Sequence, residues 1–550
     1  MTPGKAKLDA VDRDKADAVF YAKVLTLEER SASAEAVAVA EGQIVYVGDR
    51  AGAKTWIDED TQIHDFKGAA LYPGFVDAHG HVMSLGRGLS RLNLTGTRSF
   101  EEVVKRVRDW AEDHPGAWIL GRGWDQNDWK RKRFPTRDKL DKVAPDRPVA
   151  LHRVDGHALL VNGKALQIAG ISKDTPDPDG GRILRNAATG EPTGVLVDNA
   201  VDLVREHLPP VDDRTRREHA DRAIERLLSV GLTGIHDAGT GDAELSTFES
   251  MAQEGALRVR IYAMIDGGAT SGIQLMQWAP RVGLYDHRLT VRAIKLFADG
   301  ALGSRGAWLT EDYADDSGNK GLRITQPTEL MAKARLAHEQ GYQVAIHAIG
   351  DAAARTVLDT YEAVFARALA KPNAIKPRPR LEHAQVVDPD DRMRMAAMKV
   401  VASMQPIHAT SDMPWAGDRL GARRVEWAYT WRSMLDNGVP TAFGSDCPVE
   451  VPDPLKGIYA AATRQDANGR PKGGWTAKER VSIKEAVQAY TTGAAWAAFE
   501  EDIRGTITAG KLADFTVLDR DILSLKNPRQ LLKTKVVATV VAGVIEHPAQ

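Results

Sequence analysis

Short apolar runs alternate with amphipathic helical stretches along most of the chain. In residues 213–230, for example, apolar side chains recur at the spacing of one buried helix face. Eight strand-length apolar runs occur, at residues 75–79, 233–237, 259–265, 291–298, 343–347, 380–383, 400–405 and 441–445. Eight strand–helix units in alternation predict an α/β fold, a (β/α)8 TIM barrel, in which functional side chains lie at the carboxyl ends of the strands.

The first two predicted barrel strands are separated by about 120 residues, which is far too many for a strand-to-helix connection. This segment has its own predicted helix at residues 100–113 and its own apolar runs, AWILGRGWD and RPVALHRVD. We therefore predict an inserted α/β subdomain at residues 91–212. The barrel is then divided into residues 71–90, which carry its first strand, and residues 213–500.

The two ends of the chain are rich in β-type runs. Residues 17–70 include AEAVAVAEGQIVYVGD, and residues 501–550 include ADFTVLDRD and KVVATVVAGVIEH. Neither set is large enough to form a core by itself. We therefore predict that they meet in one small β-sandwich domain, with the barrel inserted between them. Residues 1–16 are polar and are predicted to form a disordered tail.

Length and composition limit the classes of protein to consider. A chain of 550 residues exceeds what one hydrophobic core normally supports, so two or three domains are expected. Hydrophobic residues at 43% and charged residues at 27% are ordinary for a globular protein. The formal charge of -2 gives no electrostatic reason to expect nucleic acid or a membrane surface as a partner.

The sequence also bears on cellular location. The first twenty residues are charged and lack the apolar core of a secretory signal. No stretch approaches the ~18 consecutive apolar residues of a membrane span. The single cysteine, Cys447, excludes an intrachain disulfide framework. A cytoplasmic location is therefore expected, and a removed signal peptide is the alternative.

Residues suited to a metal site end five of the predicted barrel strands. His79 and His81, in YPGFVDAHGH, are two apart, so on an extended backbone both imidazoles leave one face and can converge on one ion. Four later runs end on further such residues: RAIKLFADG with Lys295, VAIHAIGD with His347, RLEHAQ with His383 and TAFGSDCP with Asp446. Zinc prefers imidazole nitrogen and carboxylate oxygen. A histidine pair alone is weak evidence, but five such strand ends predict a metal centre.

Lys295 is the exception in this set, because an ammonium group cannot coordinate a cation. In a cavity with divalent ions it would be pushed toward its neutral amine, which can react with carbon dioxide to give a carbamate. The two carbamate oxygens can bridge two metal ions. The alternative is an unmodified lysine that forms a structural ion pair with Asp299 or Asp446.

The order and context of these motifs resemble the amidohydrolase superfamily, and within it the branch of N-substituted formamide deformylase and YtcJ-like hydrolases. The resemblance covers almost the whole chain from residue 16 and includes DRPVALHRVDGHALLVN, GLTGIHDAG, FADGALGSR, RQDANG and GTITAGKLADFTVLD. It implies that His79, His81 and Asp446 hold one metal ion and that His347 and His383 hold a second. It further implies that carbamylated Lys295 bridges the two, so two divalent ions, expected to be Zn²⁺, and carbon dioxide are the implied cofactors.

A binuclear centre of this kind activates a water molecule, and the resemblance assigns to Asp446 the transfer of its proton to the leaving amine. The expected activity is metal-dependent hydrolysis of a C–N bond in a small amide or N-substituted formamide. An N-acyl amino acid hydrolase of the same fold is one alternative. A catalytically silent binding protein is another, from a different class. The oligomeric state stays open, with a homodimer as one candidate.

Four further residues are candidates for substrate contact. His157 in VDGHALLVN and Trp124 in GRGWDQNDW belong to the predicted insertion, which can cover the strand ends in a barrel of this type. His236 ends the second predicted strand, and Arg305 follows Lys295 closely. Each also has a structural alternative, such as a place in a core for the tryptophan. Three other histidines are assigned structural or surface roles: His152, His338 and His408.

Overall fold

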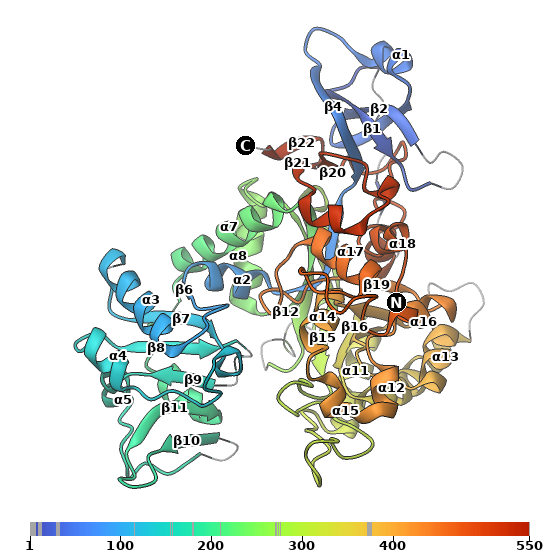
Figure 1. Ribbon diagram of the computed structural model, residues 1–550. Coiled ribbons are helices and arrows are strands. Elements are labelled where there is room, and N and C mark those ends of the chain that lie inside the picture. The colour runs from blue at the N-terminus through green and yellow to red at the C-terminus, as the bar shows by residue number, and fades with distance from the viewer. Residues whose placement is uncertain are drawn as a thin grey trace. The chain divides into compact units, whose positions relative to one another are not determined.

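The chain forms two compact units in the computed structural model (Figure 1). Unit 1 comprises Met1–Val82 and Ile224–Gln550, and unit 2 comprises Met83–Ala223. The structure describes residues 7–548 except 9–10, 12–13, 29–32, 115, 155, 157, 179–180, 210, 270–271, 273, 275–276 and 371–376. The predicted tail at residues 1–16 falls largely outside the described residues. Unit 2 contains the whole range predicted for the insertion and extends beyond it at both ends.

Unit 1 contains the predicted barrel. Its parallel strands are hydrogen-bonded in the order β19-β18-β17-β16-β15-β13-β12-β5, and a parallel bridge from Gly80 to Cys447 joins the first strand to the last. The eight strands are β5 (Phe75–Gly80), β12 (Leu232–Thr240), β13 (Arg260–Asp266), β15 (Leu289–Phe297), β16 (Gln343–Ala348), β17 (Arg380–His383), β18 (Val401–Met404) and β19 (Thr441–Phe443). Each one lies at a predicted position, so the barrel prediction is confirmed.

Helices follow the barrel strands, as the alternating sequence pattern predicts. The longer ones are α7 (Asp213–Ser229), α8 (Asp242–Gln253), α11 (Pro327–Glu339), α12 (Asp351–Leu369), α13 (Pro389–Met398), α14 (Pro406–Asp412), α15 (Ala416–Arg424), α16 (Trp431–Asp436), α17 (Pro454–Thr463), α18 (Ile483–Ala489) and α19 (Thr492–Ala497). Helix α11 shows how sequence sets the ends: Pro327 occupies its first turn, and Gly341 follows it with φ of 89°. The short strand β14 (Arg281–Gly283) pairs with β15, and the short helix α10 spans Leu284–His287.

The two ends of the chain meet in one mixed sheet of seven strands, ordered β22-β21-β20-β4-β1-β2-β3, where the sequence predicted a β-sandwich. Its strands are β1 (Ala18–Leu25), β2 (Ser33–Ala40), β3 (Gln43–Gly48), β4 (Gln62–Pro73), β20 (Phe515–Leu518), β21 (Val536–Val541) and β22 (Val544–Pro548), and α1 spans Arg50–Ala53. The sheet is continuous because β4 pairs with β1 from the N-terminal segment and with β20 from the C-terminal one. Phe20, Leu71 and Phe515 lie in one shared apolar core.

A buried ion pair between Arg260 and Asp514 connects this sheet to the barrel. The Arg260 guanidinium in β13 donates to both Asp514 oxygens at 2.6 and 2.9 Å, and each side chain is 3% exposed. Asp514→Ala leaves a buried unpaired guanidinium, so we expect the free energy of unfolding to fall by about 3–5 kcal/mol. Urea denaturation measures the loss. The control Asp65→Ala removes an exposed ion pair with Arg50 and should cost far less stability.

The same pair predicts a pH dependence of stability. Burial opposes ionisation of Asp514, but the charge and hydrogen bonds of Arg260 outweigh it and lower the pKa. A carboxyl group whose pKa is lower in the folded state stabilises the fold above its unfolded pKa of about 3.9. This contribution is lost as the pH falls through the folded-state pKa. Equal losses of stability in Asp514→Ala and Asp65→Ala would contradict the assignment.

Unit 2 is built on a six-stranded sheet, ordered β10-β11-β9-β8-β7-β6. Its elements are α2 (Val82–Leu89), which begins at the last residue of unit 1, β6 (Leu92–Asn93), α3 (Phe100–Asp113), β7 (Ile119–Trp124), α4 (Asp138–Val143), β8 (Val149–Arg153), β9 (Ala158–Val161), α5 (Gly163–Ile168), β10 (Gly181–Arg185), β11 (Pro192–Asp198) and α6 (Asp202–Arg205). Strands β6, β7 and β8 are parallel, and α3 and α4 connect them. The mixture of helices and strands is the α/β composition expected for the insertion.

Within the described part of the chain, no helix is both long enough and apolar enough to cross a lipid bilayer.

Candidate metal centre

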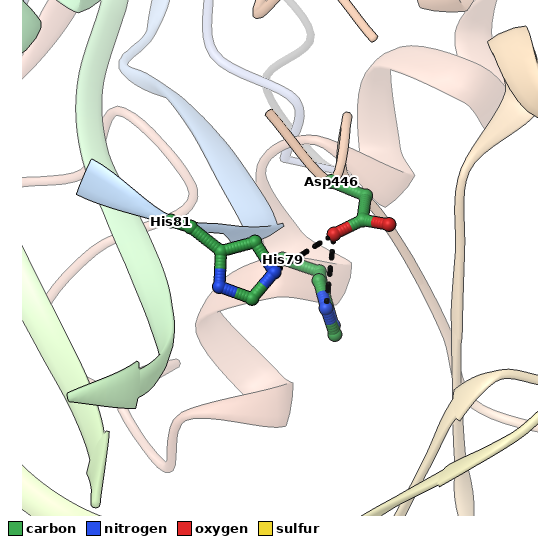
Figure 2. A group of neighbouring side chains, drawn as sticks. All are labelled: His79, His81 and Asp446. Atoms are coloured by element: carbon green, nitrogen blue, oxygen red, sulfur yellow. Dashed lines mark hydrogen bonds and ion pairs between the residues drawn. The ribbon is translucent and has the colours of Figure 1, made fainter. Parts of the chain in front are cut away.

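The first two histidines lie at the carboxyl end of β5, where the sequence predicts them (Figure 2). The His79 side chain is buried, and that of His81 is 30% exposed. The residue between them must be small, because a Cβ on Gly80 would lie 2.8 Å from both the Cys447 sulfur and the Ile235 side chain. The backbone N–H of His81 donates to the Cys447 carbonyl at 2.8 Å. The glycine therefore lets the two strands approach while both imidazoles point to one place.

Asp446 lies opposite this pair, three residues after the end of β19 (Figure 2). One carboxylate oxygen is 3.0 Å from Nε2 of His81 and 3.5 Å from Nε2 of His79. Burial alone would raise the pKa of Asp446, but the hydrogen bond with His81 and the nearby imidazoles lower it well below its ordinary value. The group is therefore a carboxylate, the form that binds cations. Its φ of 56° is costly for a non-glycine residue and is typical of a functional position.

The other two predicted histidines lie on neighbouring strands. His347 is in β16 and His383 ends β17, and their ring centroids are 4.4 Å apart. The His383 ring is also 4.8 Å from that of His79. Burial, helped by the charge of Lys295, lowers the pKa of His347 to about 3. Burial lowers the pKa of His383 well below its ordinary value too. Both rings are therefore neutral, which metal coordination requires.

Hydrogen bonds orient two of these rings toward a common point. Nδ1 of His79 lies 2.5 Å from a Glu382 oxygen, and Nδ1 of His383 lies 2.9 Å from the side-chain oxygen of Gln405. Each Nδ1 therefore carries the proton, and each Nε2 keeps a lone pair. Among the described residues, the buried Nε2 of His79 has no hydrogen-bond partner. A buried acceptor with no donor, beside a carboxylate and other neutral imidazoles, fits a metal ion.

Lys295 lies close enough to the candidate ligands for its charge to act on them. Its side chain in β15 is buried, and its charge acts on all four histidines: His79, His81, His347 and His383. Burial lowers the pKa of Lys295 to about 8, although Glu382 and Asp446 oppose the shift. No ion pair joins Lys295 to Asp299 or Asp446 in the described structure, which disfavours the alternative of a structural ion pair. Nζ of Lys295 lies 4.3 Å from the centroid of the Phe297 ring.

A buried network holds Glu382 in place behind His79. The Arg380 guanidinium is fully buried and donates to Glu382 at 2.6 Å and to the Ala78 carbonyl at 2.7 Å. Arg380 also donates to Nδ1 of His236 at 2.9 Å, so the proton of His236 is on Nε2. Burial opposes ionisation of Glu382, yet Arg380 and His79 lower its pKa well below the ordinary value. The fixed carboxylate in turn fixes the His79 ring.

Glu382→Gln tests this support. A glutamine retains the shape but loses the charge that orients His79, and losing such a partner typically costs about 10–100-fold in metal affinity. We expect a loss of this size in chelator competition. Glu362→Gln is the control, since Glu362 is an exposed partner of Arg394. Unchanged metal affinity in a folded Glu382→Gln protein would contradict the role given to this carboxylate.

Two acidic residues order the loops beside the ligands. Asp299 is fully buried and accepts backbone N–H groups of Trp308, Ile349 and Gly350 at 2.8–3.0 Å. Asp237 accepts the backbone N–H of Val82 at 2.7 Å and so fixes the chain directly after His81. Both carboxylates therefore fix the backbone next to candidate metal ligands, Asp237 after His81 and Asp299 after His347.

His408 is a further candidate ligand, to which the sequence analysis assigned a structural or surface role. In the described part of the chain, two trios bring their ligand atoms within 4.8 Å of one another: His79, His81 and Asp446, and His383, His408 and Asp446. Nε2 of His408 is buried without a hydrogen-bond partner among the described residues and lies 3.9 Å from the second Asp446 oxygen. His347 belongs to neither trio. The sequence does contain one indication of this role: His408 follows the seventh barrel strand, and functional residues of such barrels lie beyond the carboxyl ends of the strands.

The four predicted substrate contacts have different surroundings. Trp124 is fully buried in the core of unit 2, and its indole donates to the Leu151 carbonyl at 2.7 Å, which favours the core interpretation. His236 is buried next to Arg380, and its Nε2 has no hydrogen-bond partner among the described residues. Arg305 pairs with Asp315 at 2.8 Å. His157 lies outside the described residues.

Comparison with known proteins gives a consistent set of relatives. A model described as an amidohydrolase family matches residues 62–547. A protein of Bacillus subtilis (strain 168) named as an amidohydrolase, YtcJ, is 35% identical over 95% of this chain and 98% of its own. N-substituted formamide deformylase of Arthrobacter pascens is 29% identical over 96% of this chain and 98% of its own. A crystal structure from Pyrococcus horikoshii OT3, titled as a metal-dependent hydrolase, has a TM-score of 0.77 and 28% identity, covering 92% of this chain and 98% of that one.

Proposed function

We propose that this chain, which belongs to the amidohydrolase family, hydrolyses the C–N bond of an amide or an N-substituted formamide. Family membership and a metal-dependent hydrolase as structural neighbour make it a hydrolase. The bond and the substrate class are the proposed part. The relative named N-substituted formamide deformylase, which aligns over nearly the full length of both chains, supports them.

One observation carries the proposed centre. The buried Nε2 of His79, without a hydrogen-bond partner in the described structure, lies 3.5 Å from an Asp446 oxygen that is also 3.0 Å from His81. These three residues would hold one divalent ion, and His347 and His383 would hold a second. Lys295 would join the two as its carbamate. Imidazole and carboxylate donors suit Zn²⁺.

When bound, the two ions would lower the pKa of a water molecule and polarise the substrate carbonyl. The chain's own part in proton transfer falls to Asp446. Its lowered pKa keeps it ionised at neutral pH, so it can accept a proton from the attacking water and pass it to the departing amine. The Nε2–H of His236 is a buried donor with no partner in the part of the chain that the structure describes, and we propose it as a substrate contact.

Screening an amide library with zinc and bicarbonate supplied, read by amine release, tests this proposal. N-substituted formamides are expected to turn over fastest. Preferred turnover of N-acyl amino acids would keep the reaction and change the substrate class. A protein that binds about two metal ions but releases no amine from any member would contradict C–N hydrolysis.

A further inference from the structure

The parallel strands of unit 2 bring polar side chains together at their carboxyl ends. In the sheet register, Asn93 at the end of β6 pairs with Arg122 of β7, and Arg122 pairs with His152 of β8. Residues paired across neighbouring strands project their side chains to the same face. These three residues therefore form a polar row. In open α/β sheets, ligands bind at this end of the parallel strands.

Two helices add basic groups to this row. Helix α2 carries Arg87, and Arg91 follows its end. A Cβ on Gly86 would lie 1.8 Å from the backbone oxygen of His219 in α7, so the two helices touch beside Arg87. Arg87, Arg91 and Arg122 are named the arginine cluster here.

Two members of the arginine cluster lack an acidic partner. Among the described residues, no carboxylate forms an ion pair with Arg87 or Arg91, and the buried Nε of Arg87 has no hydrogen-bond partner. The Arg122 guanidinium donates to the Val154 carbonyl at 3.0 Å. Two half-buried guanidinium groups, those of Arg87 and Arg91, are costly to hold together without a counter-charge among the described residues, and a bound anion would offset their repulsion.

The pKa values of Arg91 and of two neighbouring histidines are lowered, in part by the positive charges of the arginine cluster. Burial, followed by the charges of Arg87 and Arg122, lowers the pKa of Arg91 to about 10. Burial and the charge of Arg91 lower the pKa of His152 to about 4. The pKa of His219 is also lowered to about 4, by burial and then by Arg87 and Arg91. Both histidines are therefore neutral at pH 7 and do not add to the charge.

We propose that the arginine cluster of unit 2 is a binding site for a small oxyanion, the carboxylate or phosphate group of a small molecule. Guanidinium groups suit such ligands because their N–H donors match two oxygens at once. The site is made of unit 2 residues alone. It therefore shares no residue with the metal-ligand set.

Isothermal titration of the full-length protein at low ionic strength tests the site, with inorganic phosphate and acetate as separate probes. At least one probe should bind saturably, and Arg91→Gln should weaken that binding at least about tenfold. The control Arg108→Gln, at an exposed position of α3, should leave it unchanged. Phosphate binding alone would indicate a phosphoryl ligand, and acetate binding alone would indicate a carboxylate.

Thermal unfolding gives a second readout that separates binding from folding. Without added anion, Arg91→Gln should be at least as stable as the native protein, because it removes a half-buried charge that has no partner. With the probe, only the native protein should gain stability. Absence of saturable binding for both probes, or equal binding by Arg91→Gln, would overturn the proposal. Lower stability of Arg91→Gln without anion would do the same.

Discussion

Asp446→Asn is expected to keep the fold and lose turnover by about a thousandfold or more, measured as kcat on the best amide substrate. An asparagine cannot accept a proton, and proton transfer by a positioned carboxylate is worth about 10²–10⁴-fold. The same change removes a charged group that lies 3.0 Å from His81, so weaker metal binding should add to the loss. Circular dichroism and metal analysis of the same samples separate these contributions.

The matched control is Asp418→Asn, because Asp418 is an exposed residue of α15. It should retain the activity of the native protein. Turnover that survives in Asp446→Asn, with metal still bound, would remove the proton-transfer role. It would leave the ligand role intact.

Lys295→Ala should lose both metal and activity. If the lysine carries a carbamate between two ions, alanine removes the only bridging ligand, and the metal content should fall from about two equivalents to less than one. Adding acetate or propionate with zinc should restore part of the activity, because a free carboxylate can take the place of the carbamate. Metal analysis by mass spectrometry and amine release provide the two readouts.

Lys333→Ala is the control, since Lys333 pairs with Glu329 on the surface of α11. It should bind metal and turn over substrate as the native protein does. A Lys295→Ala protein with full metal content and full activity would contradict the bridging role. Loss of activity that no carboxylate restores, with metal retained, would point to an unmodified lysine.

The barrel could be predicted from sequence because its signal is local. Each strand is a short apolar run, and helices such as α12 carry the 3.6-residue period between them. The continuous seven-stranded sheet of the two ends was less accessible. It depends on β4 pairing with β1 on one edge and with β20 on the other. Pairing between segments so far apart in the chain cannot be predicted from the residues of any one of them.

The metal-ligand candidates could be found because histidine, lysine and aspartate stand out at the ends of apolar runs. Their supporting groups could not. Glu382 and Gln405 are ordinary polar residues whose roles follow from hydrogen bonds to His79 and His383, made across neighbouring strands. His408 lies three residues beyond Gln405 within α14, so its position after the seventh barrel strand is a weaker signal than a place at the strand end itself.

The residues of unit 2 illustrate a different limit. Arg87, Arg91 and Arg122 are scattered among many arginines, and only the strand register and the packing of α2 on α7 bring them together. Composition gives no hint of this cluster, because the formal charge of the whole chain is -2. A local excess of charge can therefore be read only from the structure.

Diffraction of crystals grown with zinc and bicarbonate, measured at the zinc absorption edge, tests the central claim most directly. The account predicts two anomalous peaks, one at His79, His81 and Asp446 and one at His347 and His383, with density for a carbamate on Lys295 between them. A single peak, no peak, or peaks held by other residues would contradict a binuclear centre.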